Sequence, residues 1–293
     1  MKDRKIPLGV AFLLANLVLI NSFCSAQKVV QPKAQEDWVR DFEPFRIAGN
    51  LYYVGTYELA SYLITTSQGN ILINTGTAES VPMIRAHIRQ LGFELADVKI
   101  LLTNQVHYDH VGGMAGIKKL CHAKMMVDSA DAEVLADGGA SDFVMGGKEP
   151  LFEPVTADRL LHDQDTIRLG GMQVVILHHP GHTKGSCSFV FDVKDEGRTY
   201  RVLIVNMPTI LNATKLTGMP TYQNVGKDYA YTLNELPKLQ FDLWLCPHAE
   251  QFGLHQKHQP GDAYRPDVFI DRKGYDSTVN TLQKDYQKKL GER

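Results

Sequence analysis

The chain of 293 residues has little cysteine and no excess of positive charge, and these shortages exclude several classes of protein. It contains only four cysteines, and 31 Lys+Arg nearly balance 33 Asp+Glu, for a formal net charge of −2. A chain without a basic excess is not expected to bind the phosphate backbone of nucleic acids. No internal repeat or low-complexity tract is present, so repeat architectures are not indicated either.

The four cysteines are too few to staple the fold, and the three that lie beyond the N-terminal segment are odd in number. Cys24 lies near the N-terminus, and Cys121, Cys187 and Cys246 each follow or lie within an apolar run. Export would permit disulfides, but three thiols cannot all pair, so we expect buried free cysteines. Cys246 shares its side of an extended strand with His248, two residues on, and we still interpret it as a core residue.

Residues 1–26 have the composition of a secretory signal peptide. A basic start precedes an apolar run, Leu8–Ile20, and a small-residue site, Ser25-Ala26. The run is too short and too early for a stable membrane span. We therefore expect cleavage after Ala26 and export to the periplasm. Lipidation of Cys24 is the less favoured alternative, because the residues before it do not match a lipidation site.

The remainder is expected to comprise an N-terminal arm, residues 27–45, and one domain, residues 46–293. Loss of the signal peptide removes three positive charges and one negative charge, so the net charge changes from −2 to −4. Periodicity predicts strands at Leu51–Val54, Ala60–Thr66, Asn70–Asn74, Val98–Leu102, Lys124–Val127, Thr166–Leu169, Gln173–Leu177, Ser188–Asp192 and Arg201–Val205, and helices at Glu79–Leu91, Met114–Leu120, Ala130–Ala136, Tyr229–Leu236 and Tyr275–Leu290. This alternation favours an α/β fold with helices on the faces of sheets.

The stretch Gln105–His110 is the clearest candidate for a functional site in the sequence. It reads Gln-Val-His-Tyr-Asp-His and follows the apolar strand that ends at Leu102. Two imidazoles and a carboxylate on a tight loop are ligands that suit zinc, whose catalytic sites take about three protein ligands and leave a position for water. Histidines on a surface turn are the alternative interpretation of this loop taken alone.

Two later loops repeat the arrangement of a strand followed by histidine. The strand-like run Gln173–Leu177 precedes His178-His179-Pro180-Gly181-His182, and the run Phe241–Cys246 precedes Pro247-His248. A catalytic serine nucleophile is not indicated, because Ser186 and Ser188 do not lie in a G-x-S-x-G motif. The three loops together predict a metal centre.

On these three motifs the chain resembles the metallo-β-lactamase superfamily, which has an HxHxDH loop, an HPGHT turn and a late histidine in the same order. The stretch Leu203–Thr209 lacks both the aspartate of the bridged dizinc hydrolases and the cysteine of the B1 lactamases. The resemblance is therefore closest to subclass B3 enzymes of the GOB type, which share the glutamine at position 105. It implies an αββα sandwich of two mixed β-sheets flanked by helices.

The resemblance also implies two sets of metal ligands for one or two Zn²⁺ ions. The first site would use Gln105, His107 and His182, and the second Asp109, His110 and His248. A neutral glutamine oxygen is a poorer zinc ligand than an imidazole nitrogen, so the second site is expected to bind zinc more tightly. Asn74, where most members have aspartate, is a candidate supporting residue, and Thr209 and Met207 are candidate substrate contacts. His178 and His179 are expected to be structural.

The activity implied is that of an exported β-lactamase that confers resistance. A zinc-bound hydroxide would open the amide bond of a small β-lactam, with Asp109 as the catalytic residue that holds zinc and accepts a hydrogen bond from the attacking water. One alternative is a zinc hydrolase of another ester, thioester or lactone, and another is a non-catalytic metal-binding protein. The C-terminal segment Asp271–Arg293 shows no clear dimer stripe, and we expect a monomer.

Overall fold

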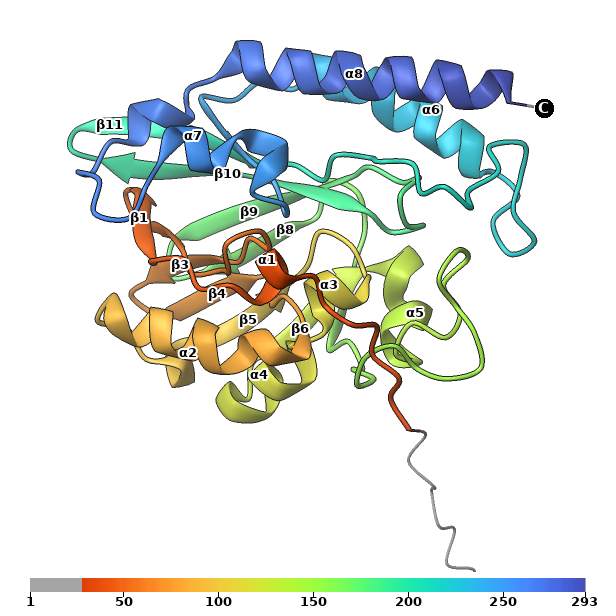
Figure 1. Ribbon diagram of the computed structural model, residues 1–293. Helices are drawn as coiled ribbons and strands as arrows, with labels where there is room; N and C mark the ends of the chain where they lie inside the picture. Colours follow the sequence, from red (N-terminus) through yellow and green to blue (C-terminus); the bar gives the residue numbers. More distant parts are fainter. Residues whose placement is uncertain (1–27, 293) are drawn as a thin grey trace, which may run out of the picture.

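The computed structural model describes residues 28–292, so the predicted signal peptide and Cys24 lie outside the described residues. Two sheets lie face to face between two layers of helices (Figure 1). The first sheet has seven strands in sequence order: β1 (Phe45–Ala48), β2 (Leu51–Tyr53), β3 (Tyr62–Thr66), β4 (Gly69–Ile73), β5 (Val98–Leu102), β6 (Lys124–Asp128) and β7 (Arg159–Leu161). The second has the order β12 (Leu243–Leu245), β11 (Arg198–Ile204), β10 (Cys187–Asp195), β9 (Met172–His178) and β8 (Thr166–Leu169).

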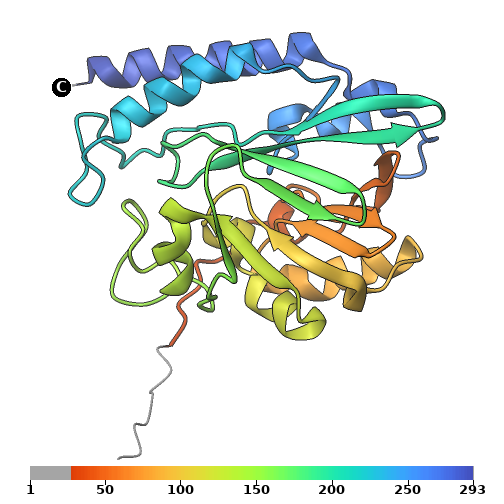
Figure 2. The same cartoon turned by 180° about the vertical axis from the view of Figure 1, so that it is seen from behind.

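Helices cover the outer face of each sheet, as Figures 1 and 2 show from opposite sides. The α-helices are α1 (Glu36–Val39), α2 (Val81–Gln90), α3 (Tyr108–Val111), α4 (Met114–Cys121), α5 (Ala132–Ala136), α6 (Val225–Glu235), α7 (Leu254–Lys257) and α8 (Arg272–Gly291). Helices α2 and α4 lie against the first sheet, and α6 and α8 lie against the second. The predicted αββα sandwich of mixed sheets is confirmed.

Alternation along the strands divides the core into layers. On β4, Ile71 and Ile73 pack in the cluster between the two sheets, whereas Leu72 packs with Ile84 and Ile88 of α2. Adjacent residues of a strand point to opposite faces, so one apolar run serves both layers. A strand buried on both faces is fixed in position by packing on each side. The first residues of the loop that follows it are therefore fixed in position as well.

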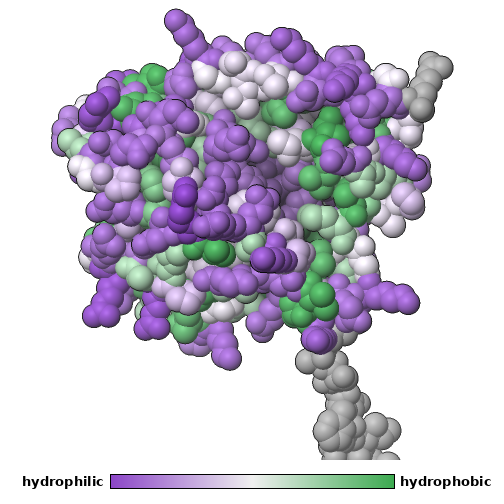
Figure 3. Space-filling view, in the orientation of Figure 1, coloured by the Kyte–Doolittle hydropathy of each residue, from purple (hydrophilic) through white to green (hydrophobic). Residues whose placement is uncertain are grey.

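Several expectations about single segments can be compared with the structure. Cys121, Cys187 and Cys246 are free and buried, as predicted. Strands β5 and β8 have the predicted bounds, whereas α6 begins four residues earlier than predicted, at Val225. Within residues 28–292, no helix has both the length and the apolar character needed to cross a membrane. Hydrophilic residues dominate the face seen in Figure 3, with hydrophobic groups mainly towards its right side.

Candidate metal centre

Three loops bring the predicted ligands to one edge of the sandwich. Residues 103–110, the ligand loop, leave β5 of the first sheet, and residues 179–186, the histidine turn, leave β9 of the second. The loop that carries His248 leaves β12. This strand runs in the same direction as β9, because β9 and β11 both pair antiparallel with β10 and β12 pairs parallel with β11. Loops at the ends of parallel strands converge on one edge of a sheet, which explains how residues far apart in sequence meet here.

The second predicted site is assembled completely. Asp109 Oδ2 lies 3.3 Å from His110 Nε2 and 3.4 Å from His248 Nε2. One ligand atom from each of the three residues lies within 4.8 Å of the others. Asp109 and His110 are buried, and His248 is partly exposed. Two imidazoles and one carboxylate at this spacing form a set that suits a zinc ion with an open coordination position.

The first predicted site lies beside it. The rings of His107 and His182 have centroids 4.8 Å apart, and both side chains are buried. Gln105 is 3% exposed, and its Oε1 atom has no hydrogen-bond partner. A buried amide oxygen without a partner costs about 1–3 kcal/mol, so its acceptor is expected to be used by a bound group.

These observations fit a metal centre. Besides Gln105 Oε1, the buried His110 Nε2 also lacks a partner of hydrogen-bond geometry. Each orphaned atom belongs to a different predicted site, and each carries a lone pair that a cation would use. The donor set of imidazole nitrogens, one carboxylate and one amide oxygen suits zinc better than calcium or magnesium, which prefer all-oxygen sites.

Three neighbours orient the histidine rings. The Thr209 carbonyl accepts a hydrogen bond from His182 Nδ1 at 2.7 Å, which leaves Nε2 for a metal. Asp142 Oδ2 lies 3.3 Å from His107 Nε2, and Glu58 Oε1 lies 3.3 Å from His248 Nδ1. Such partners fix the tautomer and direction of a ligating imidazole. Sequence patterns gave no signal for Asp142 or Glu58, because each reaches the site only through tertiary folding.

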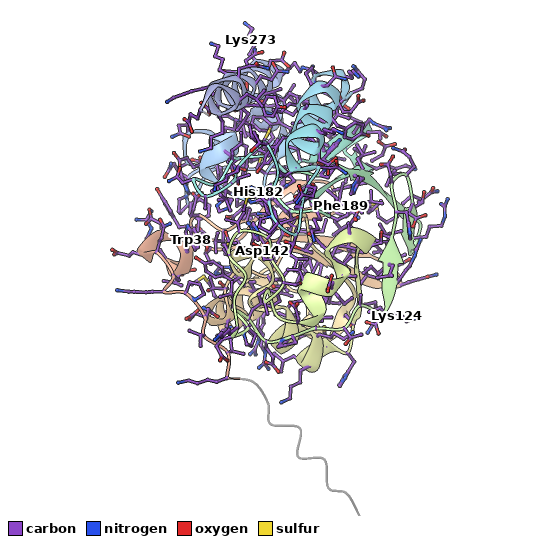
Figure 4. The ribbon with its side chains drawn as sticks, turned by 90° about the vertical axis from the view of Figure 1, so that its right-hand side faces the viewer. Trp38, Lys124, Asp142, His182, Phe189 and Lys273 are labelled. Atoms are coloured by element: carbon purple, nitrogen blue, oxygen red, sulfur yellow. The ribbon has the colours of Figure 1, made fainter. Side chains whose placement is uncertain are left out.

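Figure 4 shows how part of this arrangement lies in space. His182 and Asp142 lie near the middle of this view, where the parts of the molecule that contain the two sheets meet. Asp142 also accepts hydrogen bonds from the backbone N–H groups of Val144 and Met145, at 2.8 and 2.6 Å. The carboxylate therefore ties the loop around Asp142 to His107.

Burial and neighbouring charges set the protonation of the ligands. Burial lowers the pKa of His182 to about 3, which keeps this imidazole neutral at pH 7. Burial opposes ionisation of Asp109, but His110 and His248 prevail and hold the pKa of that carboxyl well below its usual range. Burial also opposes the charge on His248, whose pKa the Asp109 and Glu58 carboxylates raise to about 9. A metal at the second site must therefore displace a proton from His248.

Asn74 supports the ligand loop through hydrogen bonds to Asn104 rather than to a ligand side chain. Its Oδ1 accepts a hydrogen bond from the Asn104 N–H at 3.1 Å, and its Nδ2 donates to Asn104 Oδ1 at 3.0 Å. Asn104 in turn donates to the carbonyls of Cys187 and Ile204 in the second sheet. An aspartate at position 74 would lack the amide donor, so Asn74 and Asn104 form a matched pair.

The candidate substrate contacts lie in different surroundings. Thr209 lies next to His182 through its backbone carbonyl, whereas Met207 is 2% exposed and packs in the core between the sheets. Trp38 of α1 packs against Tyr108 and His248, with ring centroids 5.9 and 6.1 Å apart. The segment expected to be an N-terminal arm therefore forms one aromatic wall of the site, a feature that no sequence pattern indicated.

Of the histidines expected to be structural, both bond to protein groups. His178 Nδ1 lies 2.8 Å from Asp128 Oδ2, and His179 Nδ1 lies 2.7 Å from the Ser188 hydroxyl. Neither takes part in the cluster formed by Asp109, His110 and His248.

A fold that holds two adjacent sets of metal ligands between two sheets defines a class of metalloprotein, and comparison with known proteins identifies the family. Residues 58–195 match the model of the metallo-β-lactamase superfamily. A class B3 di-zinc metallo-β-lactamase, LRA-12 from an Alaskan soil metagenome, is 58% identical over 90% of this chain and 100% of its own, with a TM-score of 0.88. GOB-18 from Elizabethkingia meningoseptica, a metallo-β-lactamase, is 53% identical over 92% of this chain and 100% of its own, with a TM-score of 0.90.

The chain therefore belongs to the metallo-β-lactamase superfamily, among the subclass B3 enzymes that resemble GOB, as the sequence motifs predicted. A curated hydroxyacylglutathione hydrolase from Rhodopseudomonas palustris is 29% identical over 131 residues. That match spans 45% of this chain and only 42% of the relative. The similarity to this second group is thus partial.

Proposed function

We propose that the protein is a zinc-dependent β-lactamase that opens the ring of β-lactam antibiotics. The observation that carries this proposal is the assembled ligand set of Asp109, His110 and His248, within 4.8 Å, next to the pair His107 and His182. Its support comes from homologues that share more than half of their residues with this chain over their whole length.

The residues divide the work in the proposed reaction. Zinc ions held at these sites would activate water at neutral pH and polarise the lactam carbonyl. Asp109 is ionised and buried, so its carboxylate would hold the metal and would accept a hydrogen bond that orients the attacking water. Trp38 packs against Tyr108 and His248 and forms an aromatic wall on one side of the site. Thr209 as a substrate contact, Asn74 as a support and the monomeric state belong to the same proposal. Met207 does not, because its side chain is buried in the core between the sheets.

The proposal includes an asymmetry between the sites. Gln105 offers one neutral oxygen where an imidazole would offer nitrogen, so the Gln105/His107/His182 site is expected to hold zinc more weakly than the Asp109/His110/His248 site. Export to the periplasm also belongs to the proposal, and it rests on residues 1–26, outside the described part of the chain.

The direct test is hydrolysis by purified, zinc-supplemented protein of a chromogenic cephalosporin and a carbapenem, with a chelator-treated sample as the control. We expect turnover that the chelator abolishes and added zinc restores. A thioester of glutathione and a lactone form the comparison arm, motivated by the partial match to hydroxyacylglutathione hydrolase. Zinc-dependent turnover of the thioester alone would replace the β-lactamase proposal with the alternative activity.

A further inference from the structure

Asp131 lies outside both ligand sets, yet its carboxylate joins the ligand loop to the histidine turn. Oδ2 accepts hydrogen bonds from the Val106 N–H at 3.2 Å and from the Thr183 hydroxyl at 2.6 Å. Oδ1 accepts one from the Gly185 N–H at 2.7 Å. The side chain is 1% exposed, so few other partners can reach it. Val106 lies between two first-site ligands, and Thr183 follows the third.

The position of Asp131 in the sequence suggests a simpler role that the structure excludes. It is the N-cap residue of α5, where an aspartate commonly accepts a hydrogen bond from the first turn, worth about 1 kcal/mol. The Asp131 side chain makes no such bond. Asp128, three residues earlier, does cap its own turn by accepting from the Ala130 N–H at 2.9 Å. Asp131 gives up local capping for tertiary hydrogen bonds.

The contact on the histidine turn is close enough to require glycine. A Cβ atom placed on Gly185 would lie 2.6 Å from the Asp131 backbone nitrogen and 2.7 Å from its Cγ. Real side chains do not approach so closely, so a larger residue at position 185 would push the turn away from the carboxylate. The turn and the carboxylate are therefore fitted to each other.

We propose that Asp131 is a positioning residue for the first metal site, and that it fixes the spacing between the ligand loop and the histidine turn. This inference rests on the proposed function, because it assumes that Gln105, His107 and His182 bind metal together. The second site depends on it less. Its ligand-loop members, Asp109 and His110, lie three and four residues beyond the bonded Val106, and His248 comes from the loop after β12, to which none of these hydrogen bonds of Asp131 runs.

The test is a titration of the Asp131→Asn variant with zinc, in which calorimetry measures the affinity of each site. Asparagine keeps the size of the side chain but has one acceptor oxygen, so it cannot accept from all three donors. We expect affinity at the weaker site to fall by about 10–100-fold, the range for loss of a residue that supports a metal ligand, while the tighter site is unchanged. A His182→Ala variant, which lacks one first-site ligand, identifies which binding event belongs to that site.

Two further variants separate positioning from folding. Asp128→Asn is the matched control, because Asp128 is equally buried but bonds to Ala130 and His178 rather than to either metal-binding loop. It should leave both affinities unchanged. Thr183→Val removes one donor to Asp131 with little change of shape, so it gives a smaller loss in the same direction even if Asp131→Asn folds poorly.

The inference is overturned if Thr183→Val and every folded Asp131 variant bind two equivalents as wild type does, or if wild type takes up only one equivalent at millimolar zinc. A wild-type protein that binds two equivalents but hydrolyses no β-lactam would instead refute the proposed function. In that case the effect of Asp131 on the weaker site would still stand or fall by the titration.

Discussion

At the scale of single residues, Gln105 decides how the two sites differ. Its buried Oε1 has no protein partner, which indicates a ligand role, but a neutral amide oxygen is a weak partner for zinc. Gln105→His should raise the affinity of the first site by roughly tenfold or more, because an imidazole nitrogen replaces that oxygen. Zinc titration against a chromophoric chelator measures both sites at once.

The second site serves as an internal reference in that experiment, since its three ligands are untouched. Gln240→His adds a histidine at an exposed position and controls for loose surface binding. An unchanged affinity for the second equivalent of zinc in Gln105→His would show that the glutamine is not the cause of the asymmetry.

His179 makes a residue-scale prediction about pH. Burial lowers the pKa of this imidazole to about 4, below its usual value of 6.5. The unfolded chain therefore takes up a proton as pH falls through 6.5, whereas the folded protein resists until about pH 4. Stability is lost across this window as pH falls, by about 2 kcal/mol between pH 7 and pH 5 from this one residue.

His179→Gln should remove this pH-dependent loss of stability. The measurement is the free energy of unfolding in urea of the metal-free variant and of the metal-free wild type, at pH 7 and at pH 5. Both proteins keep the same metal ligands, whose own titration cancels in the comparison. His162→Gln, at an exposed position, is the control and should behave as wild type. Equal losses of unfolding free energy in His179→Gln and wild type would contradict the assignment.

At the scale of elements, the sequence predicted those whose own side chains determine their structure. The run Val98–Leu102 forms β5 with the predicted bounds. An apolar segment of this length that is followed by polar residues is typical of a buried strand. The ligand loop could be located for the same reason. Elements with little pattern of their own were missed, such as β1 and the four-residue helix α1.

The start of α6 shows why a pattern can fail. The sequence predicted a start at Tyr229, whereas the helix begins at Val225 and includes Gly226 in its first turn, although glycine disfavours helix. In the structure Gly226 packs against the carbonyl of Leu216, where a side chain would not fit. A requirement set by another segment overrode the local preference.

The same division applies to the candidate metal centre. The six proposed ligands could be named from sequence because each lies on a loop after a recognisable strand and matches a motif of the family that the chain resembles. Their supporting residues could not, since Glu58, Asp142 and Asp131 lie on other segments and acquire their partners only on folding. Asn104 precedes a ligand directly, but its pairing with Asn74 depends on the contact between neighbouring strands.

At the scale of the whole molecule, the metal centre connects the two sheets. The ligand loop and α3 follow β5 of the first sheet, whereas His182 and His248 follow β9 and β12 of the second. Each site takes ligands from both sheets, so an ion at either site holds the two halves together at their open edge. Metal binding is therefore coupled to the stability of the entire fold.

Removal of zinc should lower the thermal midpoint of unfolding. When free zinc is at 100 times the dissociation constant of a site, binding adds about 2.7 kcal/mol to the free energy of unfolding. This corresponds to a rise of several degrees in the midpoint for a protein of this size. Scanning calorimetry of zinc-loaded and chelator-treated protein measures the shift. Magnesium, which prefers oxygen ligands, is the control ion and should give no shift. Identical midpoints with and without zinc would refute the coupling.

The dependence on metal equivalents makes this measurement sharper. If the Asp109/His110/His248 site fills first, most of the rise in midpoint should come with the first equivalent of zinc, and the second should add less. His248→Ala removes the second-sheet ligand of the tighter site and should abolish the early rise, whereas His182→Ala should spare it. A larger loss from His182→Ala would reverse the order of the two sites while leaving the bridge between the sheets intact.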